Sequence, residues 1–110
     1  MKFQGANLDL QMSLRQKFLI DYLGEGYTEN YIDKEPVIYR DLDDYDVEIS
    51  GGHTKEQTIS IFVWSKAPRQ IVEFHTRMPQ HLRQIRLLLD DITTRYTNKE
   101  ENNNEKDYVC

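Results

Sequence analysis

The sequence predicts a small α+β domain, in which an antiparallel sheet of three or four strands is packed by an N-terminal helix and a long C-terminal helix. Three observations predict this fold. Three short segments alternate apolar and polar residues, a C-terminal stretch repeats its apolar residues at helical spacing, and an N-terminal stretch begins with a helix-capping pattern. A chain of 110 residues has the length of one domain, which we assign to residues 1–98.

The N-terminal helix is expected over residues 13–23. Ser13 followed three positions later by Gln16 matches a capping box, and Gly24 is a typical residue at which a helix ends. The apolar residues of the expected helix follow at helical spacing: Leu14, Phe18 and Tyr22. The sequence does not decide between helix and strand for residues 7–12, because their apolar residues alternate as in a strand although they directly precede the expected helix.

Three segments in the middle of the chain are expected to form half-buried strands: Tyr45 to Ser50, Thr58 to Trp64, and Gln70 to Met78. Gly51-Gly52 begins the first connection, and residues 66–69 form the second. Upstream, a loop is expected over residues 26–36, followed by a short strand at Val37 to Arg40.

A meander of these strands has one register that gathers the apolar positions on one face. In that register Val47 lies beside Ile61, and Ile61 faces Phe74. The opposite face then carries charged and aromatic residues: Asp44, Asp46, Glu48, Ser60, Phe62, Trp64, Ile71, Glu73, His75 and Arg77. Either the N-terminal helix covers Phe62 and Trp64, or they are exposed and mark a binding surface.

The C-terminal helix is expected to begin at Pro79, since proline suits a first helical position, and to end at Asn98. Its apolar residues form one stripe: Leu82, Ile85, Leu89, Ile92 and Tyr96. The stripe lasts about two heptads, which favours packing against the sheet over a coiled coil. Asp91 and Arg95 lie four apart in the favourable order.

Charge is unevenly distributed along the chain. The net charge of −5 divides into −6 over residues 1–52, +4 over residues 53–99 and −3 over residues 100–110. This pattern has two interpretations. The folded protein has an acidic and a basic surface, or the acidic and basic parts of the chain interleave in the fold and neutralise each other. Residues 99–110 are rich in Asn and Glu and are expected to be a disordered tail.

Several kinds of chemistry have no support in the sequence. The single Cys110 excludes an internal disulfide, and we expect no catalytic residue, metal site or cofactor, because the phosphate-loop, dinucleotide-binding and serine-nucleophile motifs are absent and the histidines are scattered. No apolar run is long enough for a membrane span or a secretory signal. We therefore expect a cytoplasmic protein that is not an enzyme.

The leading hypothesis is a small regulatory protein that binds another protein through an acidic, aromatic-flanked sheet surface. The candidate binding residues are Asp43, Asp44, Asp46, Glu48, Phe62, Trp64 and Arg77. Trp, Tyr and Arg are enriched among interface hot spots, and a dense carboxylate run suits a basic partner surface. By analogy with compact acidic inhibitors, the chain is a candidate phage or plasmid protein.

The alternative hypothesis is a nucleic-acid-binding regulator that uses the basic residues of the 66–86 region: Lys66, Arg69, Arg77, Arg83 and Arg86. The expected order of helix, three strands and helix is also that of double-stranded-RNA-binding domains, but the lysine cluster that they carry at the start of the last helix is missing here. A homodimer formed through Phe62 and Trp64 or through a sheet edge is a further possibility.

Overall fold

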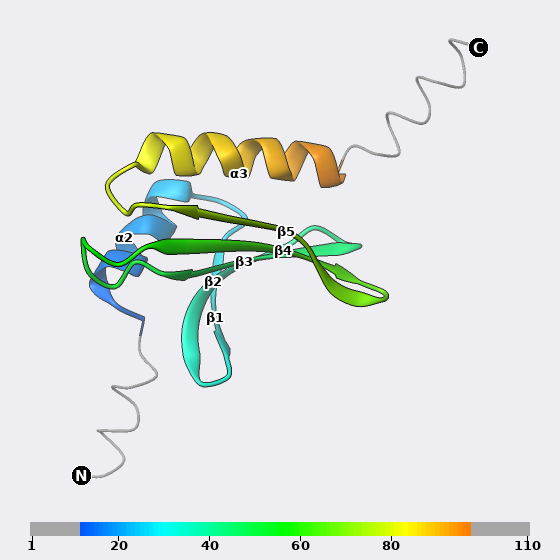
Figure 1. Ribbon diagram of the computed structural model, residues 1–110, viewed down its shortest axis with the longest axis horizontal. Coiled ribbons are helices and arrows are strands. Elements are labelled where there is room, and N and C mark those ends of the chain that lie inside the picture. Colours follow the sequence, from blue (N-terminus) through cyan, green and yellow to red (C-terminus); the bar gives the residue numbers. More distant parts are fainter. Residues whose placement is uncertain (1–11, 98–110) are drawn as a thin grey trace.

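The computed structural model describes residues 12–97, so the expectations for residues 7–11 and for the tail lie outside the described residues. Along the chain the elements are α2 (Leu14–Leu23), β1 (Thr28–Ile32), β2 (Glu35–Asp41), β3 (Tyr45–Gly51), β4 (Ile59–Lys66), β5 (Arg69–Arg77) and α3 (Leu82–Thr97). The strands form one antiparallel sheet in sequence order (Figure 1). The α+β class is confirmed, with five strands instead of three or four.

The capping box of α2 is present. The Ser13 hydroxyl accepts a hydrogen bond from the Gln16 backbone N–H at 3.2 Å, and the Gln16 side chain accepts one from the Ser13 N–H at 3.4 Å. Gly24 ends the helix with a φ of 88°, a conformation that favours glycine.

The expected apolar stripe of α2 is not its buried face. Leu14 and Phe18 are 83% and 59% exposed, whereas Gln16, Leu19 and Leu23 are buried. The Gln16 amide donates to the carbonyl oxygens of Pro36 at 3.2 Å and Gly51 at 3.4 Å. Because these carbonyls supply acceptors for a buried amide, the helix buries the face that carries Gln16, Leu19 and Leu23 and leaves Leu14 and Phe18 exposed.

The expected loop over residues 26–36 is wrong, because it contains β1 and the start of β2. Asp33 and Lys34 connect the two strands with φ values of 54° and 67°. Positive φ at both central residues is the geometry of a type I′ hairpin, usually signalled by Asn-Gly or Asp-Gly. Here the turn residues are Asp-Lys and β1 is largely exposed, so neither turn chemistry nor apolar alternation marks the strand.

The strands pair in a different register from the expected one. Between β3 and β4, Val47 lies opposite Val63 and not Ile61, a shift of two residues that keeps the predicted faces. Between β4 and β5, Ile61 pairs with His75, so the expected pairing of Ile61 with Phe74 is wrong by one residue. A slip of one residue reverses a strand, so the expected faces of β5 are exchanged over Glu73 to Arg77.

Two features fix this orientation of β5. Glu73 on the α3 side accepts hydrogen bonds from Arg95 at 3.0 Å and from the Tyr96 hydroxyl at 2.5 Å. A register shift between Val63 and Trp64 leaves Val72 without a partner in β4, so Ile71 returns to the same side as Trp64. Both features depend on contacts between elements, which local alternation does not show.

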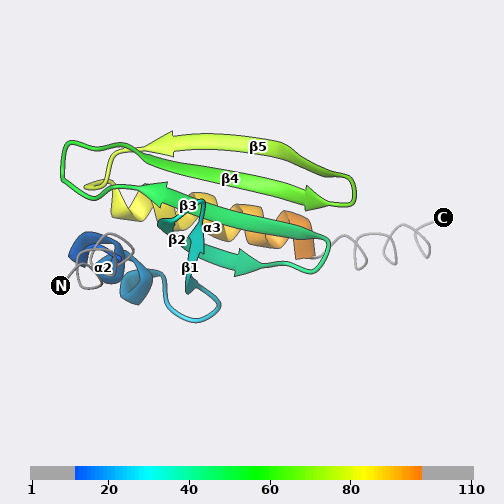
Figure 2. The same cartoon turned by 90° about the horizontal axis from the view of Figure 1, so that it is seen from below.

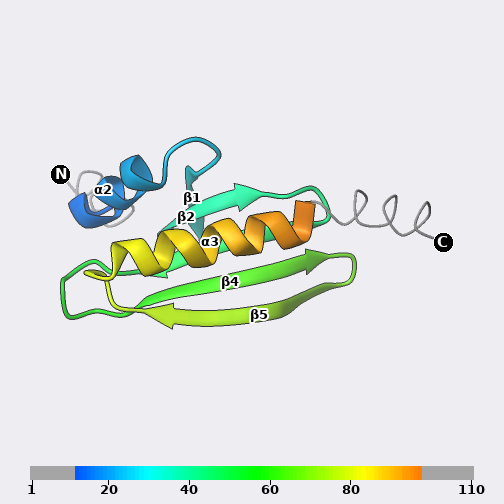
Figure 3. The same ribbon diagram turned by 90° about the horizontal axis from the view of Figure 1, so that it is seen from above.

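The core lies between the sheet and α3, which runs along one face of the strands (Figure 3). Its inner stripe is as predicted: Ile85, Leu89 and Ile92 are buried, and Leu82 and Tyr96 are partly buried at the two ends. The helix begins at Leu82 and not at Pro79, because the His81 N–H bonds the Met78 carbonyl and closes a turn before it. Within residues 12–97, no helix has the length and apolar character needed to cross a membrane.

Candidate binding surface on the open face of the sheet

Residues 12–97 leave one face of the sheet uncovered. Figure 2 looks onto this open face, with α3 behind the strands and α2 to the side, near β1. The expectation that the N-terminal helix covers Phe62 and Trp64 is therefore wrong: α2 does not cover them, and both are half-buried among neighbouring side chains.

An apolar strip runs along β4 and β5 on this face, formed by Phe62, Trp64, Ile71 and Phe74. The rings of Phe62 and Phe74 lie 5.0 Å apart, and Ile71 pairs with Trp64 across the two strands. Phe74 is 53% exposed and Ile71 46% exposed. Contiguous exposed apolar side chains of this kind are typical of interaction sites.

Trp64 is held in one orientation by charged neighbours. Its indole N–H donates to a carboxylate oxygen of Glu48 at 3.0 Å, and the Arg69 guanidinium lies 4.6 Å from the ring centroid. A cation over an indole ring is a favourable electrostatic contact. These two contacts therefore fix the orientation of the indole within the sheet.

Asp46 is an internal structural carboxylate. It is only 6% exposed, and it accepts hydrogen bonds from the Tyr39 hydroxyl at 2.5 Å and from Arg69 at 2.7 Å. Burial and the hydrogen bond to Asp46 raise the pKa of Tyr39 to about 12. Asp46 therefore positions Arg69 over Trp64 instead of offering a free charge to a partner.

Lys66 neutralises a second carboxylate of the acidic run. Its ammonium lies 2.7 Å from Asp41 and 3.6 Å from Asp46. The hydrogen bond from Lys66 lowers the pKa of Asp41 below its ordinary value. In this part of the sheet, acidic residues of the N-terminal half are therefore neutralised by a basic residue from later in the chain, which is the second interpretation of the charge pattern.

Asp43 and Asp44 lie exposed in the turn between β2 and β3. The backbone N–H of Lys66 donates to the Asp44 carbonyl at 3.1 Å, so this turn lies against the connection between β4 and β5. Asp43 has a φ of 73°, and its N–H donates to the Asp41 side chain at 2.9 Å. These two carboxylates are the acidic members of the predicted site that face solvent most openly, at the Trp64 end of the apolar strip.

The predicted basic residues do not come together. Lys66 and Arg69 lie at one end of β5, and Arg77 lies at the other end on the α3 side, away from Trp64. Nine residues of strand separate these ends by about 26 Å. Arg83 is exposed on α3, whereas Arg86 is half-buried and donates to the Tyr22 carbonyl at 3.1 Å.

Two residues of this surface, Tyr39 and Phe74, escaped the sequence prediction. Phe74 was missed because the register of β5 depends on Glu73 and the bulge, and Tyr39 because its contact with Asp46 crosses from β2 to β3. In the part of the chain that the structure describes, no three His, Cys, Asp or Glu side chains form a group that could hold a metal ion.

Because the Arg69 guanidinium lies over the Trp64 ring, the contact can be tested by tryptophan fluorescence. Arg69→Ala is expected to increase acrylamide quenching of the single tryptophan, because it uncovers one face of the ring, and to lower the unfolding free energy by about 1–2 kcal/mol, because the buried Asp46 loses one of its partners. Arg77→Ala, at the far end of β5, is the matched control and should leave quenching unchanged. Equal quenching of both variants and the parent protein would contradict the contact.

Comparison of the chain with family models, with curated protein sequences and with solved structures found no match.

Proposed function

We propose that this chain is a small regulatory protein that binds another protein through the open face of its sheet. The observation that carries the proposal is the apolar strip, in which Ile71 and Phe74 are exposed and Trp64 is already fixed by Glu48 and Arg69. A rigid aromatic anchor surrounded by apolar neighbours is typical of interface hot spots. A chain of this size would regulate its partner by occupying part of the partner's surface.

The edge of the sheet supports a specific mode of binding. β5 is an outermost strand of nine residues, and three of its apolar residues, Ile71, Val72 and Phe74, are 46%, 39% and 53% exposed. The other edge strand, β1, has five residues and a mostly polar sequence. Since proteins usually protect long apolar edges, we expect an extended segment of the partner to pair with β5 and place apolar side chains over the strip.

The acidic turn between β2 and β3, which carries Asp43 and Asp44, indicates a second property of the partner segment. Asp43 and Asp44 lie at the Trp64 end of the strip, where basic residues flanking the docked segment would meet them. Exposed charges at the rim of an interface mainly increase the association rate and its dependence on salt. We therefore propose a partner segment with apolar residues in its centre and basic residues at one end.

Affinity capture from host lysate tests the proposal when the tagged parent is compared with two variants. Phe74→Ser removes an exposed apolar residue from the strip, and Leu87→Ser removes one that is 55% exposed on α3. We expect a nuclease-resistant protein that the parent and Leu87→Ser capture but Phe74→Ser loses. With that protein purified, Phe74→Ser should weaken the affinity at least tenfold.

The acidic turn is tested with the same purified partner. Asp43→Asn combined with Asp44→Asn should slow association at low salt and have little effect at high salt; asparagine keeps the left-handed backbone at position 43 accessible. Capture that is equal for Phe74→Ser and Leu87→Ser would overturn the proposed surface. Recovery of nucleic acid, with all proteins lost after nuclease, would favour the basic residues instead.

A further inference from the structure

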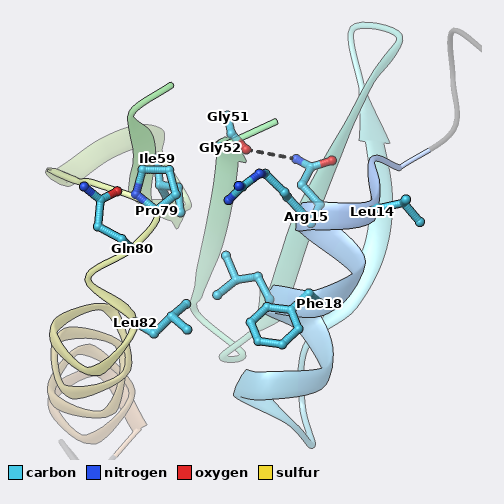
Figure 4. Close-up of a pocket in the computed structure, with 11 residues that line it drawn as sticks. Leu14, Arg15, Phe18, Gly51, Gly52, Ile59, Pro79, Gln80 and Leu82 are labelled. Atoms are coloured by element: carbon cyan, nitrogen blue, oxygen red, sulfur yellow. Dashed lines mark hydrogen bonds between the residues drawn. The ribbon is translucent and has the colours of Figure 1, made fainter. Parts of the chain in front are cut away.

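A pocket lies outside the open face, between the first turns of α2 and the segment that leads into α3 (Figure 4). Its volume is about 400 Å³, within the range of small-molecule sites. Most of its walls are apolar side chains: Leu14, Phe18, Leu19, Ile59, Pro79 and Leu82. Phe18 and Leu14, on the α2 side, are the most exposed large apolar residues of the described chain.

The floor of the pocket is preformed. The amide of Gln16 is buried and bonded to the carbonyls of Pro36 and Gly51 and to the Ser13 N–H. Gly52 is buried against Ile59, and a Cβ at this glycine would lie 2.6 Å from the Ile59 side chain. With its amide used internally, Gln16 fixes the distance between α2 and β3 instead of offering a polar group to a ligand.

Arg15 supplies the charge of the pocket. Its guanidinium extends from α2 toward Gly51 and Gly52, across the opening of the pocket (Figure 4). Among the residues that the structure describes, none makes a hydrogen bond or ion pair with this side chain. None of the described lining residues is acidic, and the first turn of α2 holds no acidic residue either.

A guanidinium that has no partner among residues 12–97 and lies beside apolar walls defines a ligand class. The ligand needs an aliphatic body that covers Phe18 and Leu82, and an anionic head that pairs with Arg15. A carboxylate matches the planar fork of a guanidinium, and the N-terminal end of α2 adds a positive dipole in the same place.

We propose that this pocket binds an aliphatic carboxylate, with the carboxylate on Arg15 and the chain between Phe18 and Leu82. The proposal does not depend on the protein-binding function of the open face, because the two sites share no residue. The pocket lies where α2 meets the end of β3 and the turn before α3, so a bound ligand would tie these three segments together.

Titration of the full-length, isotope-labelled protein with decanoate below its micelle concentration tests the proposal. We expect amide shifts in NMR spectra to centre on Arg15, Phe18, Gly52 and Leu82 and to leave Phe74 unmoved. Arg15→Gln should weaken decanoate binding about tenfold and leave decanol binding unchanged, because only the charged head is affected. Lys17→Gln removes the same charge from an exposed position of α2 outside the pocket lining, and it should bind decanoate as the parent does.

Phe18→Ser gives a second readout, since the exposed ring can be removed without opening the core. It should weaken the binding of both decanoate and decanol. The proposal would be overturned by shifts that avoid the pocket, by equal decanoate affinity of Arg15→Gln and the parent, or by sedimentation that shows a dimer broken by Phe18→Ser, in which case the pocket is an interface between two copies.

Discussion

Replacing Ile61 with Ala is expected to lower the free energy of unfolding by about 3–4 kcal/mol, whereas replacing Phe74 with Ala should cost only about 1 kcal/mol. Ile61 is fully buried at the centre of the core, so its truncation leaves a cavity between β4 and α3. Phe74 is 53% exposed and loses mainly its contact with the Phe62 ring. Urea unfolding followed by circular dichroism measures both values.

This pair of variants separates the two registers of β5. In the register expected from alternation alone, Phe74 faces the core, and a buried Phe→Ala change costs about 3–5 kcal/mol. A loss for Phe74→Ala as large as that for Ile61→Ala would therefore contradict the pairing of Phe62 with Phe74. It would also remove the apolar strip on which the proposed function rests.

Features that depend on local spacing could be predicted from the sequence. The capping box at Ser13 is a contact between residues three apart, and the α3 stripe from Leu82 to Tyr96 follows from helical periodicity. The inward faces of β3 and β4 were also predicted, because a register error of two residues leaves Val47 and Ile61 on the same side.

Features that depend on contacts between distant elements were not predictable in this way. The orientation of β5 depends on Glu73, whose partners Arg95 and Tyr96 lie on α3, and on the bulge at Val72. The buried face of α2 depends on acceptors offered to Gln16 by β2 and the end of β3. Alternation gives no signal for either.

The candidate surface likewise combines residues whose positions follow from local spacing with residues whose positions depend on contacts between elements. Asp46, Glu48, Phe62 and Trp64 share the open face as predicted, because they belong to the two strands whose faces were correct. Arg77 was expected beside them and lies on the other side of the sheet, because it belongs to β5. The carboxylates from Asp41 to Glu48 do not act as one charged surface: Asp41 and Asp46 pair with Lys66 and Arg69, and Glu48 accepts from Trp64. Asp43 and Asp44 are exposed in the turn.

Glu73 is expected to make the stability of the fold depend on pH in the acidic range. The hydrogen bond from Arg95, with those of His75 and Tyr96, holds the Glu73 pKa at about 2, below its ordinary value of 4.5. Between these values the unfolded chain binds a proton at this carboxyl and the folded chain does not, so stability falls as pH falls from about 5 to 2. The full shift corresponds to about 3 kcal/mol, which we reduce to about 2 kcal/mol because Arg95 is 43% exposed.

Glu73→Gln should therefore lower the unfolding free energy by about 2 kcal/mol at pH 7, and most of the difference from the parent should be gone at pH 2, where the folded-state Glu73 carboxyl is half protonated. Urea titrations at several pH values between 2 and 7 measure this difference. Asp90→Asn, which removes an exposed carboxylate from α3, is the matched control and should change stability by less than about 0.5 kcal/mol at every pH. A Glu73→Gln difference that stays constant with pH would show that the carboxylate charge does not hold β5 against α3, and the orientation of the edge strand would then need another cause.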